Sequence, residues 1–226
     1  MIHFDEAKHS YTNIHTGEKY TSATTFIGKF KKPFDLEKMS QKVADKEGVS
    51  QDEIKDRWKK INKEACDYGT SINLVMENWL KGEEVSEEDN KKYVKPIEDI
   101  WTPDRSKIAP EKRLWLHEYK LAGTTDVFED NKKYFNLYDF KTNKRFSFVN
   151  QYSDWMLPPL SHMTVCEFST YALQLSLYAY MQTVLTGQNV GELACFYYDR
   201  DTCTWVKHNT PYLKKEVLEM LNHNVK

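Results

Sequence analysis

Three consecutive segments in the middle of the chain constrain the fold most, because there the sequence changes from a helical to a strand pattern. The segments lie near 107–118, 120–129 and 134–141 and are rich in aromatic and β-branched residues, which favour strands. Between the last two, the residues from Glu129 to Lys132 have the composition of a turn. The middle of the chain is therefore predicted to be a three-stranded meander.

The region before the meander is predicted to be a β-hairpin followed by helices. Residues 3–21 alternate apolar and polar positions around Asn13 and Thr16-Gly17, which favours a hairpin. From about Thr24 to Leu80 helical patterns dominate. Within that run, Asp35 and the capping box from Ser50 to Glu53 are expected to begin helices, Gly69 to interrupt one, and Gly82 to end the last.

The remaining elements alternate between helices and strands, which predicts an α/β domain with a mixed β-sheet and helices on its faces. In chain order they are a helix over Ser86–Trp101 that Pro96 kinks or splits, a long connection over 143–163, a helix over Phe168–Leu185, strands near 191–198 and 203–208, and a helix from Tyr212 to Leu221. The connection over 143–163 is longer than most loops, which suggests a lid or a binding loop, with Tyr152 and Trp155 available to stack on bases.

The composition predicts a single domain. The chain has 226 residues, of which 40% are hydrophobic, enough for one sizeable core. It has no apolar run approaching ~18 residues and no secretory leader pattern, so we expect a cytoplasmic protein with no membrane partner. Its four cysteines are scattered without zinc-site spacing and are expected to be reduced thiols. The net charge of −2 is uninformative about nucleic-acid binding, whereas local basic clusters could hold a phosphate backbone.

Two acidic residues and a lysine are predicted to converge on the meander. Asp126 and Asp139 lie opposite one another if the hairpin is centred between Lys132 and Lys133. Strand alternation then points Asp139 and Lys141 to one side. Two neighbouring carboxylates repel each other unless a cation neutralises them, and oxygen ligands select Mg²⁺ or Mn²⁺. The bare pattern also fits an ordinary surface salt bridge between Asp139 and Lys141.

The run LAGTTDVFEDNKKYFNLYDFKTNK resembles the core of the PD-(D/E)XK nuclease superfamily, in its RecB-type and phage exonuclease-like branch. The resemblance implies a restriction-endonuclease-like core over 106–226, preceded by the hairpin and helices of 1–105, within one nuclease domain. It also implies that Asp126, Asp139 and Lys141 are catalytic. Thr142 continues the D-x-K-T form of the motif.

Two further motifs carry the same resemblance. In YALQLSLYAYM, Gln174 and Tyr178 match the Q-x-x-x-Y element, whose spacing puts both side chains on one helix face. In YGTSINLVMENWL, Glu77 matches a glutamate that adds a carboxylate to the metal site, although Asn73 replaces the usual histidine. Glu111 resembles a glutamate often found ahead of the first meander strand.

The resemblance implies roles for further residues. The catalytic set is Asp126, Asp139, Lys141, Glu77, Gln174 and Tyr178, and the ligands of one or two Mg²⁺ or Mn²⁺ ions are Asp126, Asp139, Phe140 and Glu77. Nucleic-acid contacts are assigned to Ser22, Thr24, Lys29, Thr142, Lys144 and Tyr178. Four cysteines in a particular spacing would be needed for an iron–sulfur cluster, and the chain lacks that spacing, so none is expected.

The sequence thus predicts a metal-dependent deoxyribonuclease, more an exonuclease than an endonuclease, that acts on single strands or DNA ends. Its expected setting is phage-like DNA replication, recombination or repair, in the host cytoplasm if the chain is phage-encoded, and RNA is not excluded as a substrate. An alternative is a nucleic-acid-binding protein with a vestigial nuclease site. A third possibility is a structural or inhibitory phage protein that reuses the fold.

Overall fold

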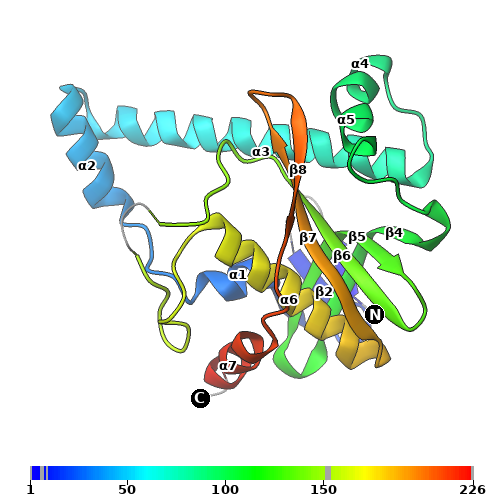
Figure 1. The fold of residues 1–226 in the computed structure, drawn as a ribbon. Coiled ribbons are helices and arrows are strands. Elements are labelled where there is room, and N and C mark those ends of the chain that lie inside the picture. Colours follow the sequence, from blue (N-terminus) through cyan, green and yellow to red (C-terminus); the bar gives the residue numbers. More distant parts are fainter. Residues whose placement is uncertain (1, 6–7, 9, 151–153, 225–226) are drawn as a thin grey trace.

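The structure, a computed structural model, describes residues 2–5, 8, 10–150 and 154–224. Its described part forms one eight-stranded sheet flanked by helices (Figure 1), which confirms the predicted mixed α/β class. The strands are β1 (Ile2–Asp5), β2 (Ser10–Asn13), β3 (Lys19–Ser22), β4 (Ile108–Leu116), β5 (Leu121–Asp130), β6 (Tyr134–Lys141), β7 (Asn189–Asp199) and β8 (Thr204–Asn209).

The helices begin and end close to the positions that the caps predict. They are α1 (Ala23–Gly28), α2 (Leu36–Glu47), α3 (Gln51–Lys81), α4 (Glu87–Asp89), α5 (Lys95–Glu98), α6 (Glu167–Thr186) and α7 (Lys214–Asn224), with a π-helical turn over Asn90–Val94 and 3₁₀ turns over Arg105–Lys107 and His117–Tyr119. Asp35 caps α2 by accepting from the Lys38 backbone N–H, and Ser50 caps α3 in the same way. The helix expected over Ser86–Trp101 runs from Glu87 to Glu98 and changes to a π-helical turn over Asn90–Val94, just before Pro96.

One local prediction was wrong, and another was confirmed with an addition. Gly69 does not interrupt a helix, because α3 runs without a break through it. A Cβ at Gly69 would lie 3.1 Å from the Thr142 hydroxyl oxygen, so this glycine allows α3 to approach the end of β6. The predicted N-terminal hairpin is confirmed, because β2 and β3 pair antiparallel around the turn at Asn13 and Thr16-Gly17, and β1 adds a further antiparallel strand beside β2.

The order of strands leaves an opening beside β5. Along one edge β5 pairs with β4 from Leu121 to Glu129. The other edge is shared, because β3 pairs in parallel with Leu121 and Ala122 and β6 pairs only from Val127 onward. On its other edge β6 pairs with β7 from Tyr134 to Lys141, so residues 139–141 keep a partner strand on that edge alone. We call the opening between residues 123–126 of β5 and residues 139–141 of β6 the fork.

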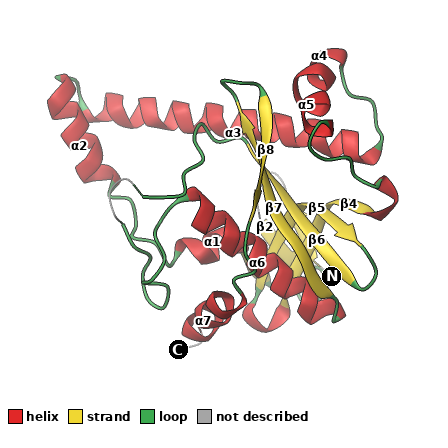
Figure 2. Ribbon diagram, viewed as in Figure 1, coloured by secondary structure: helices red, strands yellow, loops and turns green. Residues whose placement is uncertain are grey.

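Helices cover both faces of the sheet with separate cores. On one face α6 packs with α1 and α7 over Leu137, Leu193 and their neighbours. On the other face α3 and the segment around α5 enclose an aromatic cluster that includes Tyr138 and Phe196. Figure 2 shows α6 lying across the strands and α3 as a long helix passing beside them. The side chains of α6 are buried nearly all round, as expected for a helix between a sheet and other helices.

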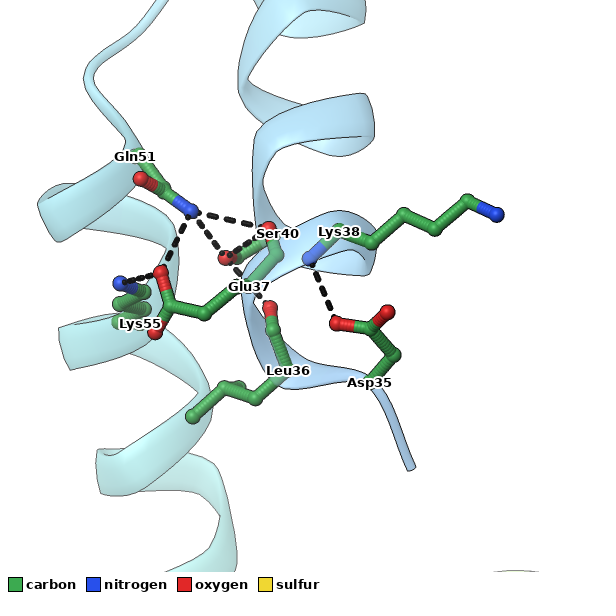
Figure 3. A network of polar contacts seen from close by, with 7 residues as sticks. All are labelled: Asp35, Leu36, Glu37, Lys38, Ser40, Gln51 and Lys55. Carbon is green, nitrogen blue, oxygen red and sulfur yellow. Dashed lines mark hydrogen bonds and ion pairs between the residues drawn. The ribbon is translucent and has the colours of Figure 1, made fainter. Parts of the chain in front are cut away.

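The first half of α3 extends beyond the sheet and carries α2 against it (Figure 1). Polar contacts join the two helices (Figure 3). The Gln51 amide donates to the Glu37 carbonyl oxygen at 2.9 Å and to the Ser40 hydroxyl at 3.0 Å, and Lys55 pairs with the Glu37 carboxylate at 2.6 Å. These contacts fix α2 on α3.

Candidate metal centre

The two acidic residues of the predicted centre lie side by side at the fork. The β5–β6 pairing ends at Val127 opposite Tyr138, so Asp126 and Asp139 occupy the next opposed positions, in the predicted register. There the strands separate, and Asp126 Oδ2 accepts a hydrogen bond from the Phe140 backbone N–H at 2.7 Å. One carboxylate of the pair thus replaces a missing strand-to-strand hydrogen bond and links β5 to β6 across the fork.

Lys141 forms an ion pair with Asp139 inside the protein. Its ammonium contacts Asp139 Oδ2, and the side chains of Lys141 and Asp139 are only 17% and 3% exposed. Because solvent barely reaches this pair, it differs from the exposed surface pairs that contribute little to stability. The predicted alternative of a surface salt bridge therefore does not describe this site.

The charges of the centre perturb one another. Burial, and then repulsion from Asp139, raise the pKa of Asp126 well above its ordinary value. Burial opposes the charge of Lys141, but the carboxylates of Asp139 and Asp126 outweigh it and raise the pKa of this lysine. Lys141 is therefore a cation at neutral pH, and one ammonium does not balance two carboxylates. Two hard oxygen donors with an excess of negative charge fit a divalent cation such as Mg²⁺ or Mn²⁺.

Tyr171 on α6 also belongs to this centre, although no motif predicted it. The Lys141 ammonium lies 4.5 Å from the centroid of the Tyr171 ring, within the range of a cation–π contact. The Tyr171 hydroxyl donates to Asn143 Oδ1 at 3.1 Å. Tyr171 precedes Gln174 by three residues and Tyr178 by seven, so the periodicity of one helix face could have identified it.

Gln174 and Tyr178 on α6 pack against β5 next to the centre. The Gln174 amide donates to the Tyr178 hydroxyl at 3.2 Å, and both side chains are buried. The Tyr178 ring packs so tightly on Gly123 of β5 that a Cβ there would lie 2.3 Å from a ring carbon. This approach explains the glycine three residues before Asp126. Both residues are placed to position the strands rather than to reach solvent.

Glu77 is not brought into direct contact with Asp126. Its carboxylate pairs with Lys81 on the same helix at 2.5 Å, and the pKa of Lys81 is raised by Glu77 and, more weakly, by Glu111. Glu111 lies between Pro110 and Lys112, which pair with Val127 and Thr125, so it faces Asp126 across β4 and β5. Its charge also helps to raise the Asp126 pKa. Among the described residues, no group of three or more His, Cys, Asp or Glu side chains has metal-binding geometry.

Phe140 and Thr142 mostly face away from the two carboxylates. The Phe140 ring packs on Trp205 at 5.5 Å in the aromatic cluster, so only its backbone can serve a metal. The Thr142 hydroxyl lies against α3 at Gly69, and the Thr142 carbonyl oxygen accepts from Arg200.

The other predicted nucleic-acid contacts lie around the site. The hydroxyls of Ser22 and Thr24 bond to each other at 3.1 Å at the start of α1. Lys29 is exposed at the end of α1, and Lys144 is exposed just after β6. In the long connection the Trp155 side chain is 50% exposed, whereas Tyr152 lies outside the described residues.

The four cysteines are free. Burial raises the pKa of the Cys195 thiol, and Cys195 lies opposite Asp139 on β7.

In the part of the chain that the structure describes, no helix is long and apolar enough to cross a membrane.

Comparison with known proteins gives only distant likenesses. Neither the family models nor the curated proteins contain a match to the sequence. A candidate exonuclease from Eubacterium rectale aligns at 12% identity with a TM-score of 0.45, over 70% of this chain and 64% of that one. SSO0001 aligns at 13% identity with a TM-score of 0.40, over 91% and 74%. The chain thus spans less than two thirds of the Eubacterium rectale protein, and likenesses this weak identify no function.

Proposed function

We propose that this protein is a divalent-metal-dependent nuclease of the PD-(D/E)XK type, which hydrolyses phosphodiester bonds of DNA at single strands or ends. One observation carries the proposal. The sheet buries Asp126, Asp139 and Lys141 together at a fork between strands, where two carboxylates and one ammonium leave an excess of negative charge. Such an arrangement is costly for stability, and catalysis with a bound cation gives it a purpose.

Each residue of the centre has a task in this proposal. Asp126 and Asp139 hold one or two Mg²⁺ or Mn²⁺ ions, and Phe140 joins through its backbone oxygen. A bound divalent cation lowers the pKa of a coordinated water and neutralises charge on the scissile phosphate. Lys141 would orient or deprotonate the attacking water and stabilise developing negative charge. Glu77 would become a metal ligand only if its carboxylate left its ion pair with Lys81.

Cleavage of labelled nucleic acids tests the proposal. Purified protein is incubated with single- and double-stranded DNA and with RNA, in Mg²⁺, Mn²⁺ or EDTA. We expect cleavage of DNA with a divalent cation and none in EDTA. Asp139→Asn and Lys141→Ala should each lower the rate at least about 100-fold, the scale of losing one group that stabilises the transition state.

A matched control separates the centre from general charge effects. Asp67 pairs with Lys63 on the exposed surface of α3 at 2.5 Å, so Asp67→Asn removes an aspartate–lysine pair of the same type and should cleave as wild type does. A product ladder would indicate an exonuclease, and discrete fragments an endonuclease. Binding of DNA without cleavage under any metal would refute the enzyme and favour a vestigial site.

A further inference from the structure

A second candidate site, which is basic, lies at the other end of β5 from the fork. A cavity of about 730 Å³ opens between the start of β4 and the β5–β6 turn. We call it the basic cavity, because its lining brings three lysines and one acidic residue together: Lys107, Lys112, Lys132 and Asp130, beside Phe128, Asn131 and Tyr134. It is separate from the fork, because the strand from Asp126 to Asp130 spans about 13 Å at roughly 3.3 Å per residue.

Lys112 gives the basic cavity a cation without a counter-ion. Its side chain is half-buried, and its ammonium lies 3.2 Å from the centroid of the Phe128 ring. No carboxylate among the described residues lies within ion-pair distance of it, in contrast to Lys141 with Asp139. Burial lowers the pKa of Lys112, and the more distant Asp130 offsets this only in part. Removing an ammonium from water without an anionic partner is unfavourable.

Asn131 supplies an independent second donor. Its side-chain nitrogen is buried and has no hydrogen-bond partner in the described part of the chain, whereas buried polar atoms are nearly always paired. Asp130, in the same lining, does not accept from this nitrogen; its Oδ1 accepts from the Lys132 backbone N–H at 2.8 Å and from the Gln188 amide at 2.9 Å. Two residues that line one cavity thus carry a cation without an ion pair and an amide nitrogen without a hydrogen bond.

We propose that the basic cavity binds a phosphate group, with the Lys112 ammonium and the Asn131 amide as its donors. Lys132 adds positive charge at the mouth, and the 45% exposed Tyr134 ring offers a surface on which a base can stack. A phosphate satisfies a cation and an amide at once, since it presents several acceptor oxygens. The phosphate can belong to a free nucleotide or to the backbone of a nucleic acid.

Titration calorimetry in EDTA tests this site without cleavage, so its result does not depend on the proposed nuclease activity. The probes are inorganic phosphate, deoxyadenosine monophosphate and a single-stranded oligonucleotide, each added to the full chain. Lys112→Met keeps an apolar stem on Phe128 but removes the charge, and Lys133→Met is the control, an exposed lysine of the same turn. Asn131→Asp is a second variant, which replaces the unpaired donor with a negative charge.

We expect Lys112→Met and Asn131→Asp each to weaken binding at least about tenfold, and Lys133→Met to leave it within about twofold. An effect on phosphate and the mononucleotide would identify a free-nucleotide site. An effect on the oligonucleotide alone would identify a backbone contact. The site is refuted if none of the three probes binds, or if wild type and Lys112→Met bind all of them equally while both proteins keep the same thermal unfolding profile.

Discussion

The two sides of β6 differ sharply although they alternate along one strand. On the α3 side, Tyr138 and Phe140 enter an aromatic cluster in which Trp101 lies 5.2 Å from Tyr138 and 4.9 Å from Phe196 between ring centroids. On the α6 side, Asp139 and Lys141 are buried as charges beside Asp126. We call these the aromatic side and the charged side.

The difference shows how one strand can contribute to folding stability with one face and hold the candidate catalytic residues on the other. Burial of large aromatic rings is among the strongest contributions to folding, whereas buried charges cost free energy even when they are paired. The aromatic side therefore anchors the backbone that holds Asp139 and Lys141 in place. If so, mutations on the two sides should separate stability from activity.

The largest effect on stability is expected from the aromatic side. Phe196→Ala removes a fully buried ring and should lower the free energy of unfolding by about 3–5 kcal/mol. Urea unfolding measures this, with Phe34→Ala as control, because the Phe34 ring is 66% exposed. Cleavage per folded molecule should stay near wild type. A loss of cleavage without a loss of stability would contradict the division between the two sides.

The second largest loss of stability is expected when the ion pair between Lys141 and Asp139 is broken. Lys141→Met leaves Asp139 buried without its partner, and in EDTA we expect a loss of about 3 kcal/mol, the lower end for a broken buried pair. Adding Asp139→Asn should restore much of that stability, because the uncompensated charge is then gone. Equal stability of the single and double variants would show that the pair is not energetically coupled.

A smaller loss of stability is expected when the contact between Gly123 and the Tyr178 ring is overpacked. Gly123→Ala puts a methyl group against the Tyr178 ring and should cost about 1–3 kcal/mol, as overpacking does, and also slow cleavage. Gly28→Ala is the matched control, because a Cβ there meets nothing within 4 Å. If both substitutions had the same effect on melting temperature and rate, close packing of Tyr178 on β5 would not matter.

The last prediction concerns how the free energy of unfolding changes with pH. Because the folded-state pKa of Asp126 is raised, this group favours folding while it is protonated, and that contribution is lost as pH rises from about 4 through the raised pKa. In EDTA, Asp126→Asn should therefore match wild type below about pH 4 and exceed it in stability near neutrality. Chemical unfolding across pH 4–8 measures the gap, and a gap independent of pH would contradict the burial of this charge.

Local patterns predicted the centre well because its parts are close in sequence. The alternation and the turn after Asp130 were enough to predict the span of β6 and the facing of Asp126 and Asp139. Gly69 misled the prediction, since only the distant Thr142 explains why a glycine stands inside α3. The parallel pairing of β3 with β5, which opens the fork, also depends on residues far apart in the chain, where periodicity gives no information. Periodicity does place Tyr171 on the helix face of Gln174 and Tyr178, but not against Lys141.

Metal binding tests the charged side most directly. Titration of Mn²⁺ into the metal-free protein, followed by the electron paramagnetic resonance of the free ion, counts the ions bound at the fork. We predict that wild type binds one or two Mn²⁺ ions, that Asp126→Asn and Asp139→Asn each weaken this binding at least about tenfold, and that Asp67→Asn binds as wild type does. Mn²⁺ binding that is absent from wild type, or unchanged in both fork variants, would contradict a metal centre between β5 and β6.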